Sequence, residues 1–245
     1  MADVANHATL TTDLLFYYEF EEASGTRVDA HNSYDLTDVN TVGQATGKVG
    51  NCASFNDANS EYFTSTFNGA TEIGTGDFSF ATWFKVSSQD VRRQFISFDV
   101  PGGWTKQFSV RAGRNSDGND IRVVTDDGAT GGSLATASGY QDGAWHFCVV
   151  TRVGTTVKLY VDNILKDTDV NSHNDMPLLA DMRIGAIEGT VVTAYMDGEL
   201  DQMGFWGKEL SSTERSDLYN SGDGLVYDDG SGGGGSTFTP RVTTY

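Results

Sequence analysis

The chain has 245 residues, a length that suits one large all-β domain or two small ones. It carries 34 acidic against 16 basic residues, for a formal charge of −18, and the acidic residues are scattered instead of forming a run. This charge makes nucleic acid and other phosphate polyanions unfavourable partners. An acidic surface remains compatible with neutral sugars, and it offers oxygen ligands to hard cations such as calcium.

The composition is rich in glycine and aromatic residues and poor in proline. There are 29 Gly, 14 Phe and 10 Tyr but only 3 Pro, which is typical of many short strands joined by glycine-rich turns. Residues 1–10 lack the basic and apolar regions of a secretory signal, and no apolar run reaches the length of a membrane span. The sequence therefore predicts a β-sandwich or barrel without a membrane span or a signal peptide in this chain.

The predicted strands begin with Leu14–Phe20 (LLFYYEF). In Phe78–Val86, apolar residues alternate strictly, which indicates a half-buried strand. Trp145–Arg152 and Val157–Val161 flank a turn that contains Gly154, so they predict an antiparallel hairpin. The other predicted strands are 53–55, 62–64, 93–99, 107–111, 121–125, 182–187 and 198–206.

One short peripheral helix is predicted over Ser211–Tyr219, where Ser211 and Glu214 have the spacing of a capping box. We divide the chain into an N-terminal arm (1–12), one sandwich domain (13–227), a glycine-rich linker (228–236) and a C-terminal tail (237–245). The linker and tail are consistent both with an engineered addition and with a segment that docks on a partner.

Two cysteines, Cys52 and Cys148, lie far apart in strand-like segments. Nothing in the sequence indicates an oxidising compartment, so we expect two buried free thiols instead of a disulfide.

Seven segments follow one another in a characteristic order: 17–25 (YYEFEEASG), 47–55 (GKVGNCASF), 76–84 (GDFSFATWF), 145–152 (WHFCVVTR), 157–162 (VKLYVD), 198–206 (GELDQMGFW) and 210–222 (LSSTERSDLYNSG). They resemble laminin G-like domains of the concanavalin A-like lectin and glucanase superfamily, and the resemblance spans about residues 12–227. The opening motif 10–13 (LTTD) and the closing motif 219–222 (YNSG) are similar to those of versions found in bacteriophage structural proteins.

The resemblance implies an all-β jelly-roll sandwich of two antiparallel sheets, with the first strand beside the strand around Asp201. Alternating aromatic and aliphatic residues fit such a core. The candidate core residues are Phe80, Trp83, Trp145, Phe147, Leu159 and Phe205.

Glucanases of this superfamily carry Glu-x-Asp-x-(x)-Glu on one strand, where a nucleophile and an acid/base lie roughly 5 Å apart. Glu199 and Asp201 match the first two positions, but Met203 and Gly204 stand where the acid/base belongs. In a regular strand Glu199, Asp201 and Met203 point the same way, so no neighbour substitutes for the missing carboxylate. We therefore expect a protein that is not an enzyme.

In laminin G-like relatives a calcium ion often lies between the loop after the first strand and the strand that contains Asp201. The resemblance points to Asp29 and Asp201 as ligands, with Asn32 and Ser33 as further oxygen donors. A second interpretation stays open, in which Asp29 and Asn32 make turn hydrogen bonds and Asp201 a strand-edge bond.

A sugar site needs an exposed aromatic ring beside hydrogen-bonding groups. Trp104, flanked by glycine and proline in a predicted loop, is the first candidate, and Tyr140, Tyr195 and Trp206 are weaker ones. The alternative is that Trp104 packs over the edge of the sandwich.

The sequence thus favours a non-catalytic adhesion module that binds glycans or cell-surface carbohydrate. A narrower hypothesis places it on a virion surface or otherwise outside the cell, as a phage decoration or fibre-type protein. It would attach to virion proteins through Met1–Thr12, Thr237–Tyr245 or both, and it could form a homo-oligomer. The alternatives are a purely structural assembly protein with no soluble ligand and, less favoured, a glycoside hydrolase with displaced catalytic residues.

Overall fold

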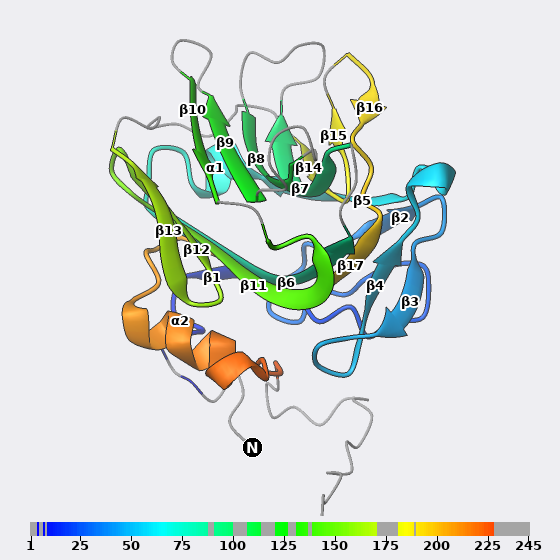
Figure 1. Cartoon of the computed structure of the whole chain (residues 1–245), viewed down its shortest axis with the longest axis horizontal. Coiled ribbons are helices and arrows are strands. Elements are labelled where there is room, and N and C mark those ends of the chain that lie inside the picture. The colour runs from blue at the N-terminus through cyan, green and yellow to red at the C-terminus, as the bar shows by residue number, and fades with distance from the viewer. Residues whose placement is uncertain are drawn as a thin grey trace, which may run out of the picture.

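The computed structural model describes Val4, His7 and residues 9–87, 91–99, 107–113, 121–126, 131–136, 139–170, 181–188 and 190–227. Two antiparallel sheets face one another and form a sandwich, as predicted (Figure 1).

The large sheet has the strand order β13-β12-β11-β6-β17-β4-β3, and β1 also pairs with β17. Tyr18 of β1 lies opposite Met203 of β17, so the predicted neighbourhood of the first and last strands is confirmed. The strands are β1 Leu14–Tyr18, β3 Gly43–Thr46, β4 Asn51–Phe55, β6 Phe78–Ser87, β11 Asp142–Val153, β12 Thr156–Val161, β13 Ile164–Asp169 and β17 Gly198–Trp206.

The small sheet has the order β10-β9-β8-β7-β14-β5-β2. A separate ribbon of two short strands, β15 and β16, stands beside it (Figure 1). The strands are β2 Thr37–Val39, β5 Tyr62–Asn68, β7 Arg93–Asp99, β8 Gln107–Ala112, β9 Ile121–Asp126, β10 Gly131–Ala135, β14 Asp181–Ile184, β15 Ile187–Glu188 and β16 Val192–Thr193.

The predicted closing helix is confirmed as α2, Ser212–Tyr219. Ser211 accepts a hydrogen bond from the N–H of Glu214, and the Glu214 carboxylate accepts one from the N–H of Ser211, which completes the capping box. The remaining short helices are η1 Asp57–Asn59, α1 Gly69–Glu72 and η3 Asn220–Gly222.

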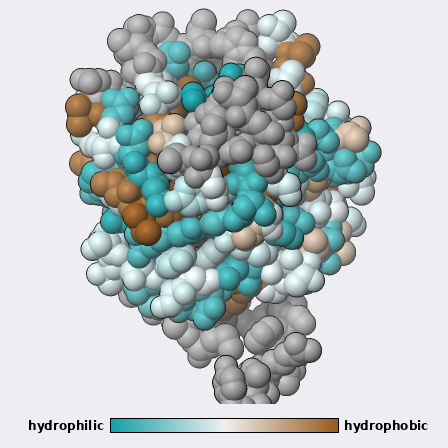
Figure 2. All heavy atoms as spheres, viewed as in Figure 1, coloured by the Kyte–Doolittle hydropathy of each residue, from teal (hydrophilic) through white to brown (hydrophobic). Residues whose placement is uncertain are grey.

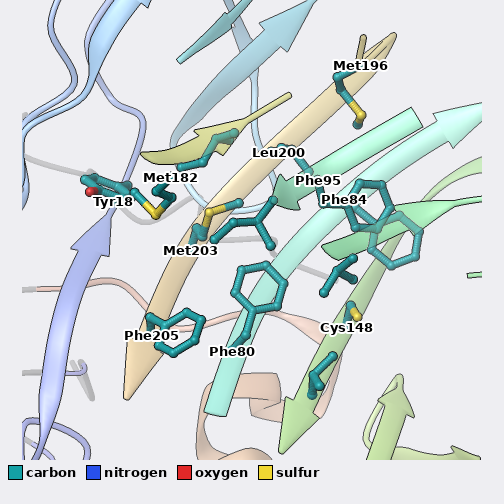
Figure 3. Packing of buried hydrophobic residues seen from close by; sticks show 14 of the residues in the cluster. Tyr18, Phe80, Phe84, Phe95, Cys148, Met182, Met196, Leu200, Met203 and Phe205 are labelled. Carbon is teal, nitrogen blue, oxygen red and sulfur yellow. The ribbon is translucent and has the colours of Figure 1, made fainter. Parts of the chain in front are cut away.

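The inner core lies between the two sheets. Phe78, Phe80, Phe84 and Val86 of β6 all reach it, as their alternation predicts. Figure 3 shows Leu200, Met203 and Phe205 of β17 in the same core, next to Phe80 and Phe84.

Phe205 lies at the centre of this core. Its ring centroid is within 6.3 Å of the rings of six phenylalanines, which come from strands of both sheets. The six are Phe16, Phe67, Phe78, Phe80, Phe98 and Phe108.

An outer apolar cluster covers the opposite face of the large sheet. There Trp83 stacks on Tyr219 of α2, with the ring centroids 5.7 Å apart, and Trp206 donates from Nε1 to the carbonyl oxygen of Leu10 at 2.6 Å. Val4 and Leu10 are fully buried in this cluster, so the N-terminal segment closes this face. Of the predicted core residues, Trp145 is the exception, because it is only partly buried at the edge of the outer cluster.

Cys52 and Cys148 are buried free cysteines, as predicted. Burial raises the pKa of both thiols well above the ordinary value, which keeps them protonated and unreactive.

We predict that Phe205→Ala lowers the free energy of unfolding by roughly 3–5 kcal/mol, because it removes the ring on which both sheets pack. Chemical denaturation measures this loss. The matched control is Val191→Ala, at a side chain that is 64% exposed, which is expected to change stability by no more than about 0.5 kcal/mol. Equal effects of the two substitutions would contradict the central place of Phe205.

Candidate functional site

The predicted ligand Asp29 holds the loop after β1 with its carboxylate. Oδ1 accepts hydrogen bonds from the N–H groups of Tyr17 and His31, both at 3.0 Å, and Oδ2 accepts one from Tyr34 at 3.2 Å. The Asn32 amide donates to the carbonyl oxygen of Leu15 at 2.8 Å. These are the bonds that the turn interpretation of Asp29 and Asn32 predicts.

Asp201 is fully buried on the outer face of β17. Its Oδ2 accepts from the N–H of Val49 at 2.8 Å, in the turn between β3 and β4. A side chain at Gly47 would place its Cβ 2.6 Å from the same oxygen, so only glycine permits this approach. Desolvation raises the pKa of the Asp201 carboxyl well above the ordinary value.

A β-bulge at Gln202 changes the geometry of this strand. The register with β6 shifts between Asp201 and Gly204, and Gln202 has a left-handed φ of 46°. Because of the extra residue, Met203 enters the inner core while Asp201 faces outward. The prediction that Glu199, Asp201 and Met203 share a direction was therefore wrong for Met203.

The carboxylates of Asp29 and Asp201 bind different segments, and no group of three or more His, Cys, Asp or Glu side chains among the described residues is arranged to hold a metal. A cation at Asp29 would meet three N–H donors, which would have to be displaced. Calcium binding stays a prediction.

The aromatic candidates have different surroundings. Tyr140 packs partly buried against the inner core, with its ring edge-on to His146 and Lys166 Nζ 5.2 Å from its centroid. Trp206 is fully buried, so a ligand does not reach it. Tyr195 keeps a partly exposed ring, and Trp104 lies outside the described residues.

A hollow of about 800 Å³ lies on the outer face of the small sheet. It is lined by residues of β7, β8, β9 and η1. Residues of the β15–β16 ribbon and of the segment after β16 complete the lining. In β8 the core-facing Phe108 and Val110 alternate with Gln107 and Arg111, which places the latter two on the outer face and in the lining.

Arg93 builds one wall of the hollow. Its side chain is only 4% exposed, and its guanidinium binds the carboxylates of Asp57 at 2.7 Å and Asp197 at 3.6 Å. Nη1 also donates to the carbonyl oxygen of Tyr195 at 3.2 Å. Arg93 thus ties η1 and the segment after β16 to the first residue of β7.

Gln94, the next residue, is a fully buried amide in the lining. Its Nε2 donates to the carbonyl oxygens of Ile96 at 2.9 Å and Val110 at 3.4 Å. Its Oε1 has no hydrogen-bond partner in the part of the chain that the structure describes. A buried acceptor without a donor costs free energy, and this oxygen lies below the surface of the hollow, where a ligand does not reach it.

Tyr195 and Arg92 complete the polar rim. The Tyr195 hydroxyl donates to the carbonyl oxygen of Val192 at 3.1 Å, and its ring lies 6.1 Å from that of Tyr62. Arg92 is exposed in the lining, and no carboxylate of a described residue forms an ion pair with it.

At the other end of β7, Asp99 is buried with Arg183. Asp99 Oδ2 accepts from the N–H of Glu188 at 2.9 Å, and Arg183 Nη1 lies 3.5 Å from Oδ1. Burial raises the pKa of Asp99 to about 6, against the opposing effects of these partners. The bond from Glu188 anchors β15 to β7, and neither Asp99 nor Arg183 lines the hollow.

The hollow was not predicted from the sequence, although Tyr195 was named among the weaker aromatic candidates. One pattern in the sequence could have indicated it. In the predicted strand 107–111 apolar and polar residues alternate, and the polar ones on the solvent side include a glutamine and an arginine. The contributions of Asp57 and Tyr195 come from segments far apart in the chain, so no local pattern predicts them.

The chain belongs to the concanavalin A-like lectin/glucanases superfamily, whose family model matches residues 57–214. No curated protein matches it. None of the helices in the described ranges is long and apolar enough to span a membrane.

Several solved structures have a similar fold. The binding domain of Paraclostridial Mosquitocidal Protein 1 has a TM-score of 0.66 at 14% identity, over 85% of this chain and 52% of that one. The receptor binding domain of botulinum neurotoxin mosaic serotype C/D has a TM-score of 0.66 at 16% identity, over 86% and 51%. The chain thus spans about half the length of these toxin domains.

A third similar structure is Domain 4 of AbnA, a GH43 extracellular arabinanase from Geobacillus stearothermophilus, in complex with arabinotriose. Its TM-score is 0.64 at 14% identity, and the match covers 84% of this chain and 97% of that one. At these identities the likeness establishes the fold alone.

We predict that His146 makes stability depend on pH. Its ring binds Asp162 at 2.8 Å and Asp142 at 3.2 Å, and the bond to Asp162 is the main cause that raises the pKa of His146. A raised histidine pKa gives stability that is complete below about pH 6.5 and is lost as the pH rises through the folded-state value.

The measurement compares wild type with His146→Gln in denaturant titrations at a series of pH values. The wild type is expected to gain stability over the variant, by up to about 1 kcal/mol, as the pH falls from about 8 to about 6. A difference that does not change with pH would refute the ion pairs.

Proposed function

We propose that the chain is a non-catalytic carbohydrate-binding module that takes its sugar in the hollow over the small sheet. The observation that carries this proposal is the hollow itself, where the partly exposed Tyr195 shares the lining with the partly exposed Gln107 and the exposed Arg92. Sugar hydroxyls both donate and accept, so they match the Gln107 amide and accept from Arg92.

The surroundings of Gln94 fit a sugar ring. The partly exposed Tyr195 offers an aromatic face for the C–H side of a ring, next to the apolar side chains of Val124 and Ile187. Gln94 and Arg111 lie on strands whose register is fixed by pairing on both sides. A site on paired strands is preorganised, which lowers the entropy lost when a ligand binds.

The carboxylates favour binding over hydrolysis. Glycoside hydrolysis uses two carboxyl groups that flank the scissile bond. Asp57 is the one carboxylate among the described lining residues, and it is bound to Arg93. Glu199 lies on the other sheet, where its carboxylate is 3.5 Å from Lys85 Nζ, and Asp201 is fully buried.

Domain 4 of the arabinanase, which has the same fold over nearly its whole length, was solved with a bound arabinose trisaccharide. That structure supports a sugar as the kind of ligand proposed here. It does not provide the residues of the site, because the two sequences share only 14% identity.

Display on a virion surface is the narrower form of the proposal. The N–H of Val4 donates to the carbonyl oxygen of Val226 at 2.8 Å, and Val4 and Leu10 belong to the outer cluster of the large sheet. The described ends of the chain therefore meet on the side away from the small sheet (Figure 1). A module held through the N-terminal segment would turn the hollow away from its support.

The proposal predicts that Tyr195→Ala weakens sugar binding about tenfold, because it removes the aromatic wall of the hollow. A glycan array on the intact chain identifies a ligand, and calorimetry measures its affinity. Tyr140→Ala is the matched control, since Tyr140 is the competing aromatic candidate, and it is expected to leave affinity unchanged. Glu199→Gln is expected to do the same, and neither it nor the wild type should release sugar from the ligand.

A blank array with folded protein would overturn the sugar proposal. It would favour the purely structural role, in which the chain binds only its assembly partner. Loss of binding in Tyr140→Ala but not in Tyr195→Ala would move the site to the edge where Tyr140 packs on His146.

Calcium enters the proposal as a structural ion between the loop of Asp29 and β17. If it binds, calcium raises the melting temperature relative to excess chelator, and Asp29→Asn or Asp201→Asn abolishes this rise. Scanning calorimetry measures both. An identical melting temperature with calcium and with chelator would leave Asp29 as a turn residue alone.

A further inference from the structure

We infer that the hollow over the small sheet binds a linear oligosaccharide segment instead of a single sugar. At least two consecutive units lie along β8, one at Tyr195 and the next towards Gln107. This inference rests on the proposed function and names the class of sugar ligand that the same site takes. It follows from where the pairing of β7, β8 and β9 places the residues of the lining.

The lining spans most of β8. Gln107, the first residue of this strand, and Arg111, the fifth, both line the hollow. Four steps along an antiparallel strand cover about 13 Å. A single sugar ring is shorter than this distance, so one unit does not contact both ends of the row.

Tyr195 lies at the Arg111 end of the row. Arg111 is opposite Gln94 of β7, and the N–H of Gln94 donates to the carbonyl oxygen of Ala194 at 3.2 Å. This bond places Tyr195, the residue after Ala194, beside the start of β7. The exposed Arg92 precedes β7 and also lines the hollow. The aromatic wall and the exposed guanidinium therefore belong to one subsite.

Gln107 lies at the other end of the row. It is opposite Asp99, the last residue of β7, and opposite Asp126, the last residue of β9. The side chain of Gln107 is partly exposed, and its amide forms no hydrogen bond with any described residue. An amide both donates and accepts, as a sugar hydroxyl does, so Gln107 suits a second sugar unit.

Apolar side chains lie between the two ends. Val124 of β9 is opposite Ser109, the middle residue of the row in β8. Ser97 of β7 is also opposite Ser109, and its Oγ donates to the carbonyl oxygen of Ala186 at 2.9 Å. Ile187, the residue after Ala186, therefore lies at the same level as Val124, and both line the hollow. Two linked rings match this order, because their C–H faces pack on the middle while their hydroxyls reach the ends.

The size of the hollow is consistent with such a ligand. Its volume of about 800 Å³ lies in the upper part of the range of roughly 300–1,000 Å³ that small-molecule sites occupy. A single sugar unit fills only part of this space.

The test measures binding of the full chain to neutral oligosaccharides that differ only in length. The probes are the arabino-, xylo-, cello- and manno-oligosaccharides from one unit upwards to six, and calorimetry measures each affinity. In at least one series we expect the affinity to rise about tenfold or more from the monosaccharide to the trisaccharide. It should then level off, because further units lie beyond Gln107.

Gln107→Ala tests the second subsite, because a partly exposed side chain can be removed without disturbing the fold. We expect it to lower the affinity for the trisaccharide about fivefold, and so to remove most of the gain with length. Tyr195→Ala is expected to weaken every member that binds. Gln44→Ala is the matched control, since it removes an exposed glutamine from β3 of the large sheet, and it should bind as the wild type does.

The outcomes separate the two proposals. Equal affinity for all lengths in the series that bind would overturn the oligosaccharide class and leave the sugar-binding function standing. A gain with length that Gln107→Ala keeps in full would place the second unit elsewhere and also overturn the inference. No binding of any sugar by the folded protein would overturn both.

Discussion

The pairing of β17 with β6 is the constraint on which the rest of the structure depends. β17 also pairs with β4 and β1, so it joins the two halves of the large sheet and the two ends of the domain. Its Phe205 is the ring on which strands of both sheets pack. The bulge at Gln202 lets Met203 reach the same core while Asp201 turns outward to hold the Lys48–Val49 turn. Asp201, which matches one position of a catalytic motif, thus holds a turn of the large sheet.

The two outer faces of the sandwich differ in chemistry. The outer face of the large sheet is apolar, and α2, the N-terminal segment and the residues before Tyr227 cover it. The outer face of the small sheet carries arginine, serine, glutamine and aspartate side chains that are largely buried, and the hollow opens there. Figure 2 shows a mostly hydrophilic surface on the viewed side, with only limited apolar patches. This division suits a module that is held by one face and binds a polar ligand on the other.

The sequence predicted the features that depend on local periodicity. Alternation in Phe78–Val86 predicted the inner core, and the spacing of Ser211 and Glu214 predicted the cap of α2. The strands β2, β3, β10, β13 and β16 were missed because they are short or lack an apolar side that alternates. The predicted strand 182–187 divides into β14 and β15, since Gly185 takes a left-handed φ of 87° and ends the first.

The site could not be predicted in the same way. The bulge at Gln202 depends on the register between β17 and β6, which the sequence does not encode in any local signal. The hollow joins Gln94 and Arg111 to Asp57 and Tyr195, and these residues come together only when the strands of the small sheet have paired. Asp29, by contrast, makes the turn hydrogen bonds that the loop sequence allowed as one of two interpretations.

The central claim is that a sugar binds over β7, β8 and β9. The measurement that tests it most directly is a crystal structure of the chain with its tightest-binding oligosaccharide. The account predicts a sugar hydroxyl within hydrogen-bond distance of Gln107 or Arg92, with the ring against Tyr195. Sugar density at Tyr140, at the Asp29 loop or on the large sheet, with the hollow filled only by water, would contradict it.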